Sequence, residues 1–192
     1  SASVLRDSGI GPVKLSSVFF GGGTPSLFAA TQIETVLHSL RERFGLSGEA
    51  EITLEANPES LSLEKLEQLA GFGVNRISFG SQSFDPSVLA VLDRRHNPTK
   101  LQPLITAANN IGLRTSMDLI YGAPGESMQS WQKTVEQAID HGTEHISAYS
   151  LIVEPGTKMK RQIASGELPN VDEDLNADKY EWMTEAFESA GL

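Results

Sequence analysis

Segments with the two-residue alternation of a β-strand and segments with the longer period of a helix follow one another along the whole chain. Short segments rich in β-branched or aromatic residues predict strands at 17–20, 50–56, 76–80, 114–120 and 145–151. Apolar residues three and four positions apart predict helices around 33–44, 63–70, 131–139 and 180–187. This order predicts successive βα units, and therefore an α/β fold with a parallel sheet and right-handed crossovers.

Residues at the predicted helix ends agree with this organisation. Thr31 and Thr99 each precede a Glu or Gln by three positions, as in a capping box, and Ser62 and Ser127 fit simple N-caps. The acidic run 172–174 suits the N-terminus of the last helix. Glycines follow four helical segments, where a left-handed C-cap favours them: Gly45, Gly73, Gly112 and Gly142.

Two of the predicted strands carry polar residues on one face only. Parallel strands covered by helices on both sides are apolar on both faces, so this pattern favours a barrel or partial barrel over an open, doubly wound sheet. We expect one cavity to receive Thr53, Glu55, Asn57, Ser78, Gly80 and Gln82. The alternate positions should be buried beneath helices: Ile52, Leu54, Ile77 and Phe79.

Composition narrows the classes of partner. The chain has 192 residues, and 15 Lys and Arg against 25 Asp and Glu give a net charge of −10. Such a surface repels phosphate backbones and anionic lipid, so we expect no nucleic-acid partner and find no indication of membrane association. No apolar segment approaches the roughly 20 residues of a membrane-spanning helix, and residues 1–12 do not resemble a signal peptide, so we expect a cytoplasmic protein. The absence of cysteine excludes disulfides, thiolate metal sites and thiol nucleophiles within the chain.

Both ends of the chain resemble cuts through a larger fold. Residues 1–14 resemble the end of a helix and its loop without the strand before them, and Gly191 would begin a link to another strand. We therefore expect residues 1–192 to form one partial-barrel domain that lacks its first βα unit. The strand that ends at Phe20 should then lie at an edge of the sheet.

A glycine-rich segment, 21–25, directly follows the first predicted strand. Its three glycines permit close approach of a ligand to the backbone, and Thr24 adds a hydroxyl. A tight turn that requires positive φ explains the same glycines equally well. The segment is neither a dinucleotide-binding fingerprint nor a phosphate-binding P-loop, because Ser26 replaces the third glycine and no lysine follows.

Polar residues near the ends of three successive strands, Glu55, Gln82 and Asp118, form the strongest candidate site, since ligands bind at that end of a βα barrel. Arg94 and Arg95 suit either a helix dipole or a carboxylate ligand. The histidines lack metal-ligand spacing: His38, His96, His141 and His145. We assign no catalytic residue and no metal ligand to the chain.

Four segments in order, 17–26, 55–58, 76–83 and 118–122, carry a resemblance. They resemble the radical S-adenosylmethionine (SAM) core of oxygen-independent coproporphyrinogen III oxidases and their relatives. The residues 147–157 and 166–169, together with 92–96, are most similar to the HemW branch of heme chaperones. The resemblance covers nearly the whole chain.

The resemblance implies a partial (β/α)6 barrel and a set of SAM contacts: Gly22, Gly23, Thr24, Glu55, Gln82, Arg94, Asp118 and, less securely, Ile152. It also implies a [4Fe–4S] cluster held by a Cys-x-x-x-Cys-x-x-Cys loop, and a C-terminal His-Asn-x-x-Tyr-Trp heme motif. Neither occurs in this chain. We expect this chain alone to be catalytically inert and to bind SAM weakly or not at all. The implied partners are SAM, heme or porphyrinogen, and a heme-accepting protein.

Two alternatives stay open at this point. The intact protein could be a true oxidase, which removes propionate carboxyl groups from a porphyrinogen by oxidative decarboxylation. Outside the family, an ordinary barrel enzyme could use Glu55 and Asp118 as acid and base.

Overall fold

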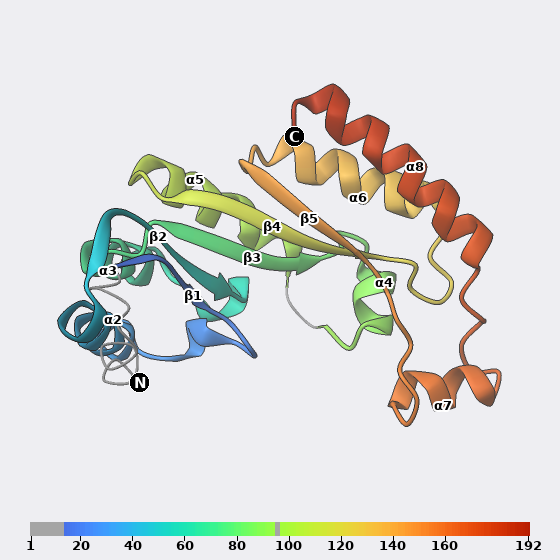
Figure 1. Ribbon diagram of the computed structural model, residues 1–192. Helices are drawn as coiled ribbons and strands as arrows, with labels where there is room; N and C mark the ends of the chain where they lie inside the picture. Colours follow the sequence, from blue (N-terminus) through green and yellow to red (C-terminus); the bar gives the residue numbers. More distant parts are fainter. Residues whose placement is uncertain (1–13, 95–96) are drawn as a thin grey trace.

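The computed structural model describes residues 14–94 and 97–192, in which five parallel strands form one sheet in the order β1-β2-β3-β4-β5 (Figure 1). The expectations for residues 1–13, Arg95 and His96 lie outside the described part. All five predicted strands are confirmed, with these bounds: β1 Leu15–Phe20, β2 Leu46–Ala56, β3 Arg76–Gln82, β4 Arg114–Tyr121 and β5 His145–Ser150.

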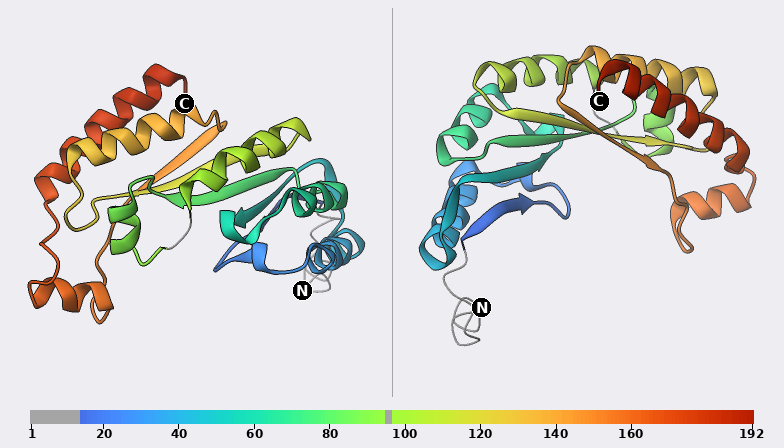
Figure 2. Two further views of the ribbon diagram at one scale, coloured as in Figure 1. Left: turned by 180° about the vertical axis from the view of Figure 1, so that it is seen from behind. Right: turned by 45° about the horizontal axis from the view of Figure 1, so that its top comes forward.

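The sheet curls into half a barrel whose convex face carries the helices and whose concave face is left open (Figure 2). The helices are α2 Ala30–Phe44, α3 Leu63–Phe72, α4 Pro86–Val91, α5 Leu101–Asn110, α6 Met128–Asp140, α7 Lys158–Ala164 and α8 Glu173–Ala190. Three 3-10 turns accompany them at Pro25–Leu27, Pro58–Ser60 and Pro98–Lys100. The short α7 projects away from the sheet on the excursion between β5 and α8 (Figure 1).

The alternation on β2 and β3 sorts the side chains as expected, with one correction. Ile52 is 4% exposed, and Leu54, Ile77 and Phe79 are fully buried in the core beneath the helices. Thr53, however, does not reach the cavity. It is fully buried and donates a hydrogen bond to the Glu51 carboxylate (2.9 Å). Thr53 lies two residues before Glu55 on β2, whereas the cavity opens at the end of the strand.

Two predicted helix starts are wrong. Helix α2 begins at Ala30, where the Gln32 side chain accepts a hydrogen bond from the Ala29 backbone N–H, so Thr31 is not its cap. Before α5, Asn97 caps a 3-10 turn by accepting from the Thr99 N–H, and Thr99 itself is not an N-cap.

The other predicted helix starts are confirmed, but not every predicted left-handed C-cap is: Gly45 ends α2 with φ 75° and ψ 151°. Ser62, Ser127 and Asp172 each accept a hydrogen bond from a backbone N–H in the first turn of their helices. Positive φ is confirmed at each of the four glycines that follow a helix: Gly45, Gly73, Gly112 and Gly142.

β1 and β5 are the two edges of the sheet that the described residues form. The position of β1 confirms that the strand ending at Phe20 is an edge strand. Large apolar side chains are exposed near it: Phe19 (59%), Leu27 (73%), Phe28 (56%) and Val36 (46%).

A buried ion pair joins α8 to the turn that follows β4. The Lys179 ammonium donates to both the carboxylate and the backbone carbonyl of Glu126, each at 2.8 Å. The same carboxylate accepts from the Gly122 N–H (2.7 Å), and the Trp131 indole donates to the Lys179 carbonyl (3.2 Å). The pair fixes α8 against α6 and the end of β4.

No helix in residues 14–94 and 97–192 combines the length and hydropathy that a membrane crossing requires.

Candidate functional site

A polar cavity of about 170 Å³ opens on the concave face, at the carboxyl ends of the strands. Its walls come from the turn after β1, from β2, β3 and β4, and from the segment that follows α4. The lining residues are Gly23, Thr24, Glu55, Ala56, Asn57, Ser78, Gly80, Gln82, Arg94 and Asp118.

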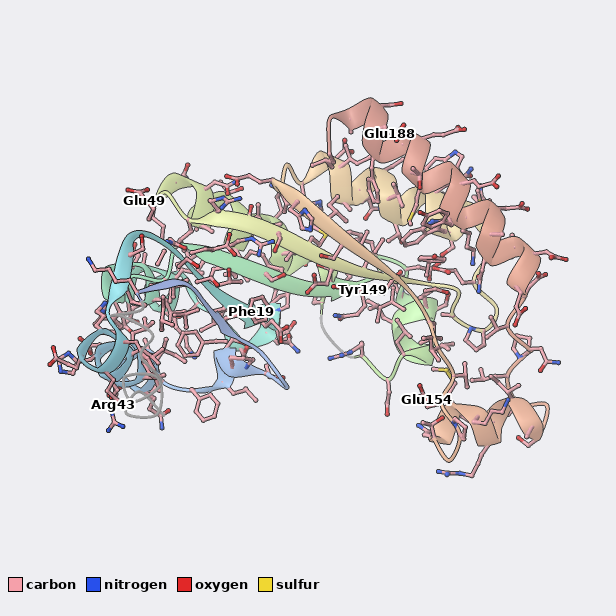
Figure 3. All side chains as sticks on the ribbon, viewed as in Figure 1. Phe19, Arg43, Glu49, Tyr149, Glu154 and Glu188 are labelled. Carbon is pink, nitrogen blue, oxygen red and sulfur yellow. The ribbon has the colours of Figure 1, made fainter. Side chains whose placement is uncertain are left out.

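Six of the eight residues expected from the sequence line this cavity: Gly23, Thr24, Glu55, Gln82, Arg94 and Asp118. Gly22 lies in the same turn but outside the lining, and Ile152 is 75% exposed and also outside it. The expected inner-face positions Asn57, Ser78 and Gly80 complete the wall, whereas nothing in the sequence reasoning pointed to Ala56. Phe19 and Tyr149, labelled in Figure 3, stand on the two edge strands that flank the concave face.

The glycine-rich turn has the positive φ values that a tight turn requires, whereas close approach of a ligand to its backbone stays a prediction. Gly22 (φ +82°) and Gly23 (φ +130°) adopt backbone conformations that disfavour any other residue. At Gly21 the constraint is space, because a Cβ there would lie 2.7 Å from the Phe19 ring and 3.0 Å from the Glu55 carboxylate. Thr24 precedes the 3-10 turn without capping it, so its hydroxyl remains available at the cavity wall.

Gln82 is held in the wall by a strained backbone. The pairing of β3 with β4 shifts by one residue between Gly80 and Gln82, which is the signature of a β-bulge. Gln82 has φ +58°, an uncommon value for a residue with a side chain. A Cβ at position 80 would lie only 2.8 Å from the Gln82 amide nitrogen. The lack of a side chain at Gly80 therefore leaves the space that this amide occupies.

Gln82 is only 8% exposed, and its buried amide oxygen has no hydrogen-bond partner among residues 14–94 and 97–192. A buried polar atom without a partner is uncommon in folded proteins and requires an explanation. Gln82 lines the cavity, so a small rotation of its side chain would turn this oxygen toward a donor on a bound ligand.

Asp118 occupies the floor of the cavity within a chain of hydroxyl groups. The Ser78 hydroxyl donates to its carboxylate oxygens (3.2 and 3.3 Å), and the Ser116 hydroxyl donates to Ser78 (2.8 Å). Burial raises the pKa of the Asp118 carboxyl above its usual value. Hydrogen bonds from Ser78 and Ser147 oppose this rise in pKa.

The charge of the cavity indicates the chemistry of a ligand. Two carboxylates, Glu55 and Asp118, accept hydrogen bonds, whereas Arg94 supplies a guanidinium at the rim. A ligand that presents hydroxyl or ammonium donors together with one anionic group would match this set. Among residues 14–94 and 97–192, no group of three or more His, Cys, Asp or Glu could hold a metal ion.

Comparison with known proteins adds a family to this geometry. The sequence model described as "Radical SAM superfamily" matches residues 10–138. The heme chaperone HemW of Mycobacterium tuberculosis is 41% identical over 177 residues, which are 92% of this chain and 45% of that protein. A mouse protein named "Radical S-adenosyl methionine domain-containing protein 1, mitochondrial" is 37% identical over 99% of this chain and 43% of its own length. The chain thus spans a little under half the length of these relatives.

Among solved structures, the coproporphyrinogen III oxidase HemN of Escherichia coli, described as a radical SAM enzyme, superposes with a TM-score of 0.86. The match covers 99% of this chain and 44% of that protein, at 27% identity. The expected partial-barrel fold is thereby confirmed.

Proposed function

The chain belongs to the radical SAM superfamily, and from that premise we propose that its cavity binds SAM within a heme chaperone of the HemW type. The observation that carries the SAM assignment is the buried, unpartnered oxygen of Gln82 in the cavity wall. The heme assignment is supported by the names of the relatives that match along nearly the whole chain.

The residues of the cavity suit the polar parts of SAM. Its ribose hydroxyls and its ammonium are donors that Glu55, Asp118 and the Gln82 oxygen can accept. Its carboxylate suits the guanidinium of Arg94, and the positive φ of Gly22 and Gly23 turns the backbone at the rim. A volume of about 170 Å³ lies below the roughly 300–1,000 Å³ usual for small-molecule sites, so this cavity holds part of the ligand.

The [4Fe–4S] cluster does not fit this chain, because the sequence has no cysteine to ligate it. Thiolates would have to come from outside the 192 residues, and we derive no step through the cluster. In this superfamily, bound SAM supplies the adenosyl group for radical chemistry. The residues described here bind and orient it: Glu55, Gln82 and Asp118 as acceptors, and Arg94 as a donor.

The second candidate function is that of an oxygen-independent coproporphyrinogen III oxidase. The observation in its favour is the high structural similarity to HemN. Sequence identity favours the chaperone, at 41% against 27%. Heme, a porphyrinogen and a heme-accepting protein remain parts of the proposal. The cytoplasmic location likewise remains a prediction, and the name of the mouse relative places that protein in mitochondria.

The test uses the intact protein, reconstituted anaerobically with iron and sulfide. SAM binding is measured by calorimetry and heme binding by absorbance, for the wild type, Glu55→Ala and the control Glu49→Ala, an exposed position on the same strand (Figure 3). We expect Glu55→Ala to weaken SAM binding tenfold or more, because a hydrogen bond to a charged group contributes about 1.5–3 kcal/mol. Heme binding should be unchanged in both variants.

Two results would contradict this proposal. Equal SAM affinity for Glu55→Ala and the wild type would remove the cavity from the SAM site. Decarboxylation of coproporphyrinogen III by the reconstituted protein would favour the oxidase over the chaperone.

A further inference from the structure

We propose that Ser26 is a positioning residue, which holds the glycine-rich turn 21–25 against the carboxyl end of β2 and so sets the spacing between two walls of the cavity. Thr24 lines one of these walls, and Glu55 and Asn57 line the other. Ser26 is fully buried and lies behind the lining residues. The inference rests on the proposed function, in which both walls contact SAM.

A closed ring of hydrogen bonds joins the two walls. The Asn57 backbone N–H donates to the Ser26 hydroxyl oxygen (3.0 Å), which lies 2.5 Å from the Ser60 hydroxyl oxygen. The Ser60 hydroxyl in turn donates to the Asn57 carbonyl (2.8 Å). Because a hydroxyl has a single proton, the proton of Ser60 is used there, and Ser26 is the donor between the two serines. The ring thus begins and ends on the backbone of Asn57.

Lys65 holds the same turn from a third element. It lies in the first turn of α3, and its ammonium donates to the Ser26 backbone carbonyl. Ser26 is therefore bonded through its side chain to the end of β2 and through its backbone to α3. The two partners are 31 and 39 positions away along the chain.

The turn needs this anchor because the sheet does not extend to it. The pairing of β1 with β2 ends where Phe20 lies opposite Leu54. Three glycines separate Phe20 from Thr24, and glycine loses more conformational freedom on ordering than any other residue. Ser26 fixes the far end of this run. A turn that is ordered before the ligand arrives lowers the entropic cost of binding.

The first measurement is hydrogen–deuterium exchange of the intact protein without SAM. Ser26→Ala removes the ring and keeps the carbonyl that Lys65 contacts. We expect the amides of 21–28 and 57–60 to exchange about fivefold faster in this variant, since a neutral hydrogen bond contributes about that factor. Exchange in the rest of the chain should be unchanged.

Two variants of Ser60 separate the hydroxyl from the fold. Ser60→Ala keeps the acceptor of the Asn57 N–H and is therefore milder than Ser26→Ala, which makes it the substitute if Ser26→Ala does not fold. Ser60→Thr keeps the hydroxyl and should restore wild-type exchange. The control is Ser127→Ala, which removes a hydroxyl that caps α6 by accepting from the Ser130 N–H (3.1 Å).

The second measurement is the Kd for SAM. We expect about fivefold weaker binding in Ser26→Ala and wild-type binding in Ser127→Ala. If Ser26 acts by placing Thr24, then Thr24→Val should weaken SAM binding less in the Ser26→Ala background than in the wild type. A purely structural role of Ser26 would leave the effect of Thr24→Val the same in both backgrounds.

Two results would overturn the inference: wild-type exchange of 21–28 in Ser26→Ala, or an equal loss from Thr24→Val in both backgrounds. Faster exchange of 21–28 in Ser26→Ala, in an intact protein that binds no SAM even as the wild type, would support the ring as the anchor of the turn. That result would contradict the proposed function instead.

Discussion

Two side chains of the cavity are in states that do not stabilise the unliganded protein. Gln82 combines positive φ with a buried amide oxygen that has no partner in the described part of the chain, and burial raises the pKa of Asp118. Backbone strain and shifted pKa values are both typical of functional sites. The polar alternation predicted both side chains at one cavity, but it could not predict the bulge at Gly80–Gln82 that aims the amide. That bulge depends on pairing with a strand more than thirty residues later.

Asp118→Asn should stabilise the unliganded protein at pH 7 while weakening SAM binding. Because the folded-state pKa is raised, the contribution of Asp118 to stability is present at low pH and is lost as pH rises through that pKa. The neutral amide of Asn avoids this loss, so we expect the free energy of unfolding at pH 7 to rise by about 0.5–1 kcal/mol. Urea unfolding at pH 4 and pH 7 measures it, and the stabilisation should be larger at pH 7.

Asp85→Asn is the control of opposite sign. Hydrogen bonds from Ser130 and Ser87 lower the pKa of Asp85, so its contribution is present above the unfolded pKa and lost as pH falls through the folded pKa. This variant should destabilise the protein more at pH 7 than at low pH. The same pH trend in both variants would refute the assignment of Asp118.

Gly80→Ala should impair SAM binding at little expense of stability. The new Cβ would lie 2.8 Å from the Gln82 amide nitrogen, and the flexible side chain can move away. We expect several-fold weaker SAM binding with unfolding free energy changed by less than about 1 kcal/mol. Gly48→Ala, where a Cβ meets nothing within 4 Å, is the matched control. Wild-type affinity in Gly80→Ala would show that the Gln82 amide does not contact SAM.

At the scale of elements, local signals predicted the strands and most helix ends, and failed where distant contacts decide. The start of helix α2 is an exception decided locally, since the Gln32 side chain accepts from the Ala29 backbone N–H and the helix begins ahead of Thr31. In the sequence, Lys179 is one of several charged residues in the last helical segment, and no local feature marks it as buried. Its burial depends on Glu126, 53 positions earlier in the chain, so no local pattern could predict the pair.

Lys179→Ala should destabilise the protein by about 3–5 kcal/mol, because it leaves the Glu126 carboxylate buried without its cation. Lys158→Ala removes an exposed pair with Asp93 (3.8 Å) and should change stability by less than about 1 kcal/mol. Urea unfolding of both variants measures the difference. A loss for Lys179→Ala as small as that for Lys158→Ala would show that the pair does not fix α8.

For the whole molecule, the polar faces of β2 and β3 predicted a barrel or partial barrel with a cavity at the strand ends, and the family resemblance implied the partial barrel. Composition could not predict how far the sheet closes. The structure leaves β1 at an edge beside exposed Leu27 and Phe28. An open edge next to apolar surface favours self-association.

Leu27→Lys should therefore reduce self-association of the 192-residue chain. Analytical ultracentrifugation over a concentration series measures the change. Tyr180→Lys, at an exposed aromatic on α8 away from this edge, should have no such effect. Equal behaviour of the two variants would remove the β1 edge as the cause.

The central claim, that this cavity is the SAM site, is tested most directly by an anaerobic crystal structure of the intact protein grown with SAM. The account predicts SAM on the concave face, with polar atoms within hydrogen-bond distance of the Glu55 carboxylate and the Gln82 amide oxygen. SAM bound elsewhere, with only water against Glu55 and Gln82, would contradict it.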